Sequence, residues 1–169
     1  MAPGLEAIGN NVSDLYTFPN GCHVAEVEID PETGLVRLDR YLLIDDFGRL
    51  LNPQLTLGQV HGGVAQGIGQ AMFERVVFDH DSGQLLSGSF MDYALPRAID
   101  LPSFEGHLSD AVPTKSNRLG VKGSGQAGCM AAPQTIMNAI LDALAPLGVT
   151  QLDMPATPQA IWRAIQASH

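Results

Sequence analysis

Residues 119–128 constrain the fold more than any other stretch, because four of the ten are glycine. Glycine lets the backbone adopt conformations, and approach other groups at distances, that a Cβ atom prevents. An apolar run with helical periodicity follows directly, so the pattern predicts a loop of bare backbone that leads into a helix. Such a helix start offers free N–H groups and a positive partial charge, which suit an anion or a polar heterocycle. We therefore expect a functional site at this loop, with Gln126 at its tip and Lys122 as its cation.

Two other interpretations of this loop remain open. A glycine-rich loop before a helix is commonly a tight connection without a ligand. Residues 123–128 also spell G-x-G-x-x-G, the dinucleotide-binding fingerprint, which is meaningful only after a strand and at the start of a helix. Residues 116–119 have little strand character, and Pro133 suits a first helical turn. We therefore expect the helix to begin too late in the chain for a Rossmann site.

A long helix rich in glycine is predicted earlier in the chain. Asn52 provides an N-cap and Pro53 a favourable first helical position, and apolar residues with helical spacing continue to about Glu74. Each glycine inside a helix costs about 1 kcal/mol relative to alanine. This helix contains five of them: Gly58, Gly62, Gly63, Gly67 and Gly69. Their number requires a reason, which is the close approach of another backbone or of a flat ligand.

The glutamines of this helix bear on the same question. Gln59 and Gln66 are seven positions apart and therefore lie on nearly one face. Either the glycines serve helix packing, or the glutamines hydrogen-bond a planar ligand across the bare backbone between them. The pattern leaves both interpretations open.

The remaining strand signals are short. Alternating residues at 23–29 and 35–44, joined by turn residues at 30–34, predict a β-hairpin. A second hairpin is predicted over residues 74–86, and a further short strand over residues 103–108.

Two shorter helices complete the predicted elements. Apolar residues from Ile136 to Leu144 mark an amphipathic helix that ends near Gly148, and Thr157 with Pro158 caps the last helix. The predicted fold class is therefore α+β, with β-hairpins, a long glycine-rich helix and two shorter C-terminal helices.

Length and charge bound the domain count and the partners. Residues 1–20 are polar and broken by proline and glycine, so we expect an extended N-terminal arm. Residues 21–169 have the length of one domain with its own core. The net charge of −9 argues against nucleic acid or an anionic membrane as a partner, since either requires a basic patch.

Metal sites and targeting segments give no positive signal. Cys22, Cys129 and the five histidines lack metal-ligand spacing, so we expect no metal ligand from this chain and two reduced thiols. The first residues show no signal-peptide pattern, and no apolar run approaches membrane-spanning length. We therefore expect a cytoplasmic protein.

With these residues, the chain resembles the C-terminal part of the molybdopterin-binding large subunit of the xanthine dehydrogenase, aldehyde oxidase and carbon monoxide dehydrogenase family. The resemblance extends over nearly the whole chain from about Phe18. It depends on five motifs in the family's order: residues 18–27, 46–53, 58–67, 90–96 and 120–128. Together these motifs are far more specific than any single glycine pattern.

The resemblance implies that residues 21–169 form part of a domain that binds a molybdenum–molybdopterin cofactor, in bacteria usually in its cytosine dinucleotide form. Gln59 matches the position that hydrogen-bonds the pterin. The loop that passes under the metal is matched by Lys122, Gly123, Ser124 and Gly125. The implied reaction is hydroxylation of an aldehyde, a heterocycle or a related small substrate with oxygen from water. The implied partners are the preceding part of the large subunit, an iron–sulfur subunit and often an FAD subunit, in an oligomer.

Two features depart from the family. Gln126 occupies the position where members normally have the glutamate that acts as catalytic base, and an amide cannot accept that proton. General-base help typically contributes ~10²–10⁴ in rate. The chain also lacks the preceding portion, which supplies much of the cofactor cavity and of the substrate channel.

Two hypotheses follow from these departures. In the first, the chain is one piece of a working molybdenum hydroxylase that another chain completes. In the second, it is a non-catalytic remnant or an assembly module of such a complex. In both cases we expect the isolated chain to hold no cofactor and to be inactive, because ligand sites bury most of their ligand and a half-cavity cannot. The substrate is not readable, since the residues that select it lie largely in the absent portion.

Overall fold

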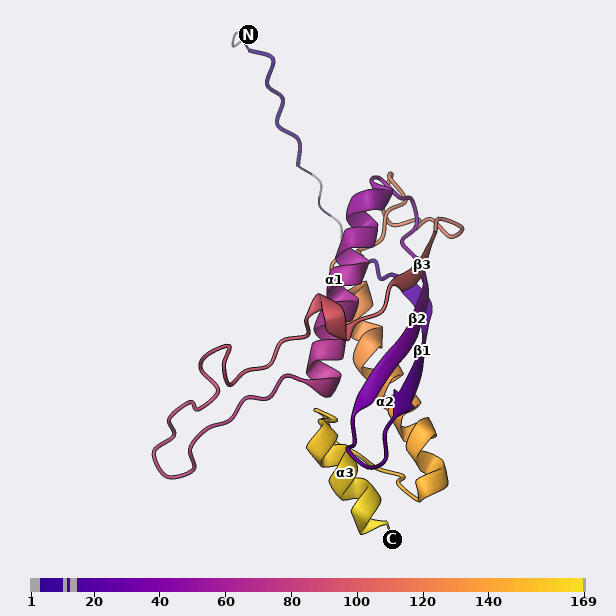
Figure 1. Ribbon diagram of the computed structural model, residues 1–169. Helices are drawn as coiled ribbons and strands as arrows, with labels where there is room; N and C mark the ends of the chain where they lie inside the picture. Colours follow the sequence, from indigo (N-terminus) through magenta and orange to yellow (C-terminus); the bar gives the residue numbers. More distant parts are fainter. Residues whose placement is uncertain (1–3, 11, 13–14, 169) are drawn as a thin grey trace.

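The computed structural model describes residues 4–10, 12 and 15–168, and these residues form an α+β domain. A three-stranded sheet in the order β1-β2-β3 forms one layer, and helices α1 and α2 form the other (Figure 1). The predicted fold class is confirmed. The predicted arm 1–20 includes residues 1–3, 11, 13 and 14, which lie outside the described residues, and its described part forms no helix or strand before Asn20.

The hairpin predicted near the start of the chain is present. β1 (Asn20–Ile29) and β2 (Val36–Asp46) pair in antiparallel fashion, and the Gly34 N–H donates to the Asp30 carbonyl at 2.7 Å in the turn between them. Gly34 has a φ of +72°, and a Cβ there would overlap with the carbonyl of Pro158. Glycine is therefore required both by the turn and by the helix that packs on it.

β3 (Phe104–Ser109) lies parallel to β2 at the opposite edge of the sheet from β1. Its position agrees with the short strand predicted over residues 103–108. The segment between α1 and β3 runs out from the body of the domain and back (Figure 1).

The second predicted hairpin lies in this outlying segment and forms only a turn. Phe78 and Leu85 make a single isolated bridge, and the Asp79 carboxylate accepts the Ser82 N–H at 2.8 Å. The prediction of two strands in residues 74–86 is therefore wrong. An isolated two-stranded hairpin is marginally stable at best, and here no further strand extends the pairing.

Two of the three helices begin where the sequence indicated. α1 (Pro53–Met72) follows Asn52, whose Oδ1 accepts the Leu55 N–H at 3.0 Å. α3 (Pro158–Ala167) follows Thr157, whose hydroxyl accepts a first-turn N–H at 3.3 Å. Both starts combine a capping side chain with proline at the first helical position.

The third helix begins earlier than predicted. α2 (Ala127–Leu144) starts directly after Gln126, and Pro133 lies inside it rather than in its first turn. An interior proline removes a helical hydrogen bond and costs about 3 kcal/mol or more. The Pro133 ring is buried, and it lies close against Gly67 of α1. The packing of the two helices offsets the cost, since most helix stability in proteins comes from tertiary packing.

The early start of α2 removes one argument against a Rossmann site. The other argument is confirmed, because residues 110–120 contain bends and turns but no strand. The G-x-G-x-x-G pattern at residues 123–128 therefore does not follow a strand directly, as the dinucleotide fingerprint requires.

The core lies between the sheet and the helices. Side chains from the inner face of β2 meet those from the buried faces of all three helices. The largest fully buried side chains are Tyr41, Val60, Val64, Ile68, Ile136, Ile140, Leu144 and Ile161.

Candidate functional site

α1 and α2 run parallel and touch through glycines. A Cβ at Gly63 would lie 2.8 Å from the Cys129 backbone nitrogen, and a Cβ at Gly67 would lie 2.6 Å from the Ala132 Cβ. The contact advances by similar steps along both helices, which shows that they point the same way. The helix-packing interpretation therefore holds for these two glycines.

A neighbouring face of α1 is open. A Cβ at Gly58 or Gly62 would meet no atom within 4 Å. Gln59 and Gln66 lie on the same face as these glycines, with Gly62 between them, and both side chains are exposed. We call Gly58, Gln59, Gly62 and Gln66 the α1 strip. Bare backbone beside two exposed amides is what the planar-ligand interpretation requires, so that interpretation stays a prediction for Gly58 and Gly62.

The α1 strip lies at the end of the helix pair where α2 begins. Gly128 packs so closely on α1 that a Cβ there would overlap with the Val60 carbonyl oxygen and lie 2.7 Å from the Val64 nitrogen. Gln59 directly precedes Val60, and Gln126 stands two residues before Gly128. The parallel packing therefore brings both predicted glutamines to one end of the α1–α2 pair.

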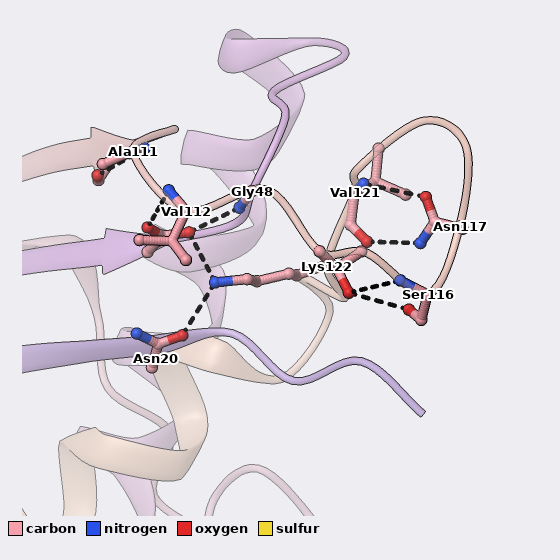
Figure 2. Close-up of polar contacts among 11 residues, drawn as sticks. Asn20, Gly48, Ala111, Val112, Ser116, Asn117, Val121 and Lys122 are labelled. Atoms are coloured by element: carbon pink, nitrogen blue, oxygen red, sulfur yellow. Dashed lines mark hydrogen bonds and ion pairs between the residues drawn. The ribbon is translucent and has the colours of Figure 1, made fainter. Parts of the chain in front are cut away.

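The entry of the glycine loop is pinned to the end of β2 (Figure 2). Val121 forms an isolated antiparallel bridge with Gly48, and the Lys122 N–H donates to the Phe47 carbonyl at 2.8 Å. The Asn117 side chain donates to the Val121 carbonyl at 2.9 Å and accepts its N–H at 3.2 Å. These bonds hold the backbone of the loop before the residues predicted to contact a ligand.

Lys122 points inward rather than to solvent. Its Nζ lies 2.9 Å from Asp46 Oδ1 and 3.1 Å from Asn20 Oδ1, and its side chain is 9% exposed (Figure 2). Asp46 also accepts the N–H groups of Gly48 at 2.8 Å and Val112 at 3.1 Å. The Gly48 N–H, and after it the Lys122 ammonium group, hold the pKa of the Asp46 carboxyl below its usual value. Contact between Lys122 and a cofactor stays a prediction.

The tip of the loop has free polar groups. Gln126 is the N-cap residue of α2, is exposed, and makes no capping hydrogen bond with its side chain. Gly125 borders open space, Gly123 meets only the Thr17 carbonyl oxygen at 3.7 Å, and Ser124 is half-buried. The first-turn N–H groups of α2 therefore lack a side-chain cap and can serve a ligand.

These groups fit the organic part of a molybdenum–pterin cofactor. Amide side chains can donate to and accept from the nitrogen and oxygen atoms of a flat heterocycle, and backbone N–H groups can donate to them. In the part of the chain that the structure describes, no group of three His, Cys, Asp or Glu side chains could hold a metal ion. Contact between these groups and the ring system of such a cofactor stays a prediction.

A buried polar chain beside the site was not anticipated from the sequence. His23 Nδ1 lies 2.8 Å from the Tyr41 hydroxyl, and His23 Nε2 lies 3.2 Å from both Asp45 carboxylate oxygens. Burial raises the pKa of Tyr41, so its hydroxyl stays protonated. Asp45 also lines a cavity of about 220 Å³ next to Ala127 at the start of α2. Strand alternation places all three side chains on the inner face, and that pattern could have revealed them.

Comparison with known proteins gives consistent matches. Residues 5–102 match the sequence model of the molybdopterin cofactor-binding domain. The chain is 39% identical over 163 residues to the nicotine 6-hydroxylase large subunit of Paenarthrobacter nicotinovorans. This match covers 96% of this chain and 20% of that subunit. It is 35% identical over 166 residues to the carbon monoxide dehydrogenase large chain of Hydrogenophaga pseudoflava, and this match covers 98% of this chain and 20% of that one.

A solved structure agrees with these matches. The quinoline 2-oxidoreductase from Pseudomonas putida 86 superposes with a TM-score of 0.83 at 38% identity, over 88% of this chain and 19% of that one. The chain spans about a fifth of the length of these relatives. No helix within the described residues has the length and apolarity needed to cross a membrane. The matched family model covers more than half of the sequence, and the chain therefore belongs to the molybdopterin cofactor-binding domain family.

Proposed function

We propose that this chain forms one wall of the molybdopterin pocket of a molybdenum hydroxylase. The observation that supports the proposal most directly is the α1 strip, an open run of bare backbone and amides beside the uncapped start of α2. When bound, the cofactor supplies the redox chemistry that hydroxylates a carbon of a small substrate with oxygen from water.

The residues of the wall bind and orient the cofactor. The Gln59 amide donates to and accepts from the pterin edge, while Gly58 and Gly62 let the ring approach the helix backbone. Gly123, Ser124 and Gly125 pass close to the reacting centre and offer backbone N–H groups and a hydroxyl.

Gln126 occupies the position of the family's catalytic base. Glutamine has nearly the shape of glutamate, so it can orient a substrate or an attacking water by hydrogen bonds at the same place. Its amide accepts no proton at neutral pH, so we expect a slower chemical step in a complex that contains this chain, by the ~10²–10⁴ that a general base contributes.

A second candidate function follows from the same residue. With Gln126 in place of a carboxylate, the chain could serve as a non-catalytic assembly module of a hydroxylase complex. Turnover separates the two candidates: a complex that contains the cofactor and converts no aldehyde, N-heterocycle or carbon monoxide supports the assembly module.

The relatives indicate the partners that we propose. The matched subunits are named for nicotine, carbon monoxide and quinoline, so we propose a small molecule as substrate, without choosing among these classes. The partners that we propose are the remaining part of a large subunit, an iron–sulfur subunit and an FAD subunit, with the cofactor in its cytosine dinucleotide form.

The test is the cofactor content of the chain purified together with its native partners. Molybdenum is measured by elemental analysis, and the pterin by the fluorescence of its oxidised form after release. We expect Gln59→Ala to lower both signals, and Gln159→Ala, which removes an exposed glutamine on α3, to leave them unchanged. A complex that contains neither molybdenum nor pterin, or a Gln59→Ala complex with the full content of both, would show that the proposal is wrong.

A further inference from the structure

We infer that Asp46 and Lys122 form a positioning pair, which fixes the glycine loop at the end of the helix pair where the α1 strip lies. The inference rests on the proposed function for what the loop tip contacts. It assigns Lys122 a role through the loop rather than a direct contact with a ligand, and it assigns a role to Asp46, which the sequence did not single out.

Asp46 and Lys122 together join four segments at one point. Its Oδ1 accepts the Gly48 N–H and the Lys122 ammonium group, and its Oδ2 accepts the Val112 N–H. Asn20, the first residue of β1, binds the same ammonium group at 3.1 Å (Figure 2). The ends of two strands, the connection after β3 and the glycine loop are therefore tied together, although Asp46 and Lys122 lie 76 residues apart.

The Asp46–Lys122 ion pair is buried, and its burial favours a single position of the loop. The Lys122 and Asp46 side chains are 9% and 10% exposed, so water screens their attraction little. Removing one partner of a buried pair leaves the other charge without compensation, and this is far more disruptive than removing both. The loop therefore has one strongly preferred position at Lys122.

The short distance along the chain from Lys122 to Gln126 transmits this position to the site. Only residues 123–125 lie between them, and two of these three are glycine. At the other end, Gly128 is held against the α1 backbone. Residues 123–126 therefore lie between two fixed residues, Lys122 and Gly128, and loss of the ion pair releases Lys122.

The test uses hydrogen–deuterium exchange of the full chain without cofactor. We expect Lys122→Met to speed the exchange of the hydrogen-bonded loop amides at residues 120–122 by about tenfold or more, because it opens the loop locally. The interior amides of α1 and α2 should keep their protection. Lys122→Arg, which retains the charge and the donors, should restore most of the loop protection, and Lys115→Met, at an exposed lysine nearby, should change nothing.

A double-mutant cycle and a milder variant extend the test. We expect the loop amides of Asp46→Asn, Lys122→Met to exchange more slowly than the sum of the two single effects, because the double variant leaves no buried charge unpaired. Asn20→Ala removes only one acceptor and should raise loop exchange by a smaller factor, which keeps the test decisive if Lys122→Met does not fold.

The outcomes separate this inference from the proposed function. Wild-type loop exchange in Lys122→Met and Asn20→Ala overturns the positioning pair, whether or not the assembled complex binds its cofactor. An equal rise over the loop and the interior of α2 also overturns it, since that pattern means a general loss of stability. Full cofactor content in the Gln59→Ala complex overturns the proposed function, whatever the loop amides show.

Discussion

Substitution by alanine should change the stability of the chain in opposite directions at two adjacent glycines of α1. Gly62 belongs to the open α1 strip, whereas Gly63 packs on α2. Changing either to alanine adds one methyl group to the same helix turn. The pair therefore separates the cost of contact from the intrinsic gain in helix propensity.

The magnitudes follow from what the added methyl group would meet. In Gly62→Ala it meets no atom within 4 Å, so the chain gains the helix propensity of alanine, about 0.5–1 kcal/mol. For a chain of this size that corresponds to a rise in Tm of about 1–4 °C. In Gly63→Ala it lies 2.8 Å from the Cys129 nitrogen and 3.1 Å from the Gly128 Cα, and neither backbone atom can rotate away. Overpacking costs about 1–3 kcal/mol, so after the propensity gain we expect a net loss of up to about 2 kcal/mol.

The assay is thermal and urea unfolding of the full chain, followed by far-UV circular dichroism. The α1 strip adds a second readout: in the complex assembled with its partners, Gly62→Ala should lower the pterin content although it stabilises the chain. Equal stability changes in the two variants would refute the division of the α1 glycines into packing and open positions. A stabilised Gly62→Ala complex with full pterin content would refute the ligand role of the strip.

Four further predictions concern the isolated chain and the assembled complex. The chain purified alone should hold no molybdenum, because half a pocket leaves a large polar ligand in water; stoichiometric metal by elemental analysis would contradict this. The isolated chain should self-associate at micromolar concentration, since Val24 and Ile44 on the outer sheet face and Phe90 and Met91 in the outlying segment are exposed; light scattering that gives a monomer mass would count against it. In the assembled complex, Gln126→Glu should raise the rate of the chemical step by about 10²–10⁴ with little change in substrate binding, as measured by single-turnover kinetics; an unchanged rate would mean that another group is the base. The Asp46 pKa is lowered on folding, so its contribution to stability should be complete above the ordinary value of 3.8 and be lost as pH falls through the lowered value. Urea midpoints of Asp46→Asn should therefore lack part of the wild-type loss of stability at acid pH, and equal acid sensitivity of the two proteins would exclude this role.

The sequence by itself determined the features that depend on residues close together in the chain. The Asn52–Pro53 and Thr157–Pro158 helix starts and the turn at residues 30–34 are as predicted, because caps and turns are made within three or four residues. The family was also readable, since five separated motifs in one order leave little room for coincidence. Gln59, Gln126 and Lys122 were singled out from the sequence pattern, the resemblance gave them and residues 123–125 a role toward a cofactor, and that role stays a prediction.

Only the tertiary structure decided features that depend on contacts between distant segments. The sequence placed Pro133 at a helix start, whereas packing on Gly67 keeps it inside α2. The glycines of α1 look alike in the sequence, and only the position of α2 distinguishes the packed Gly63 and Gly67 from the open Gly58 and Gly62. Lys122 reads as a free loop cation, yet its partner Asp46 lies 76 residues away. Periodicity and propensity describe what a segment can do alone, whereas burial and pairing depend on which segments the fold brings together.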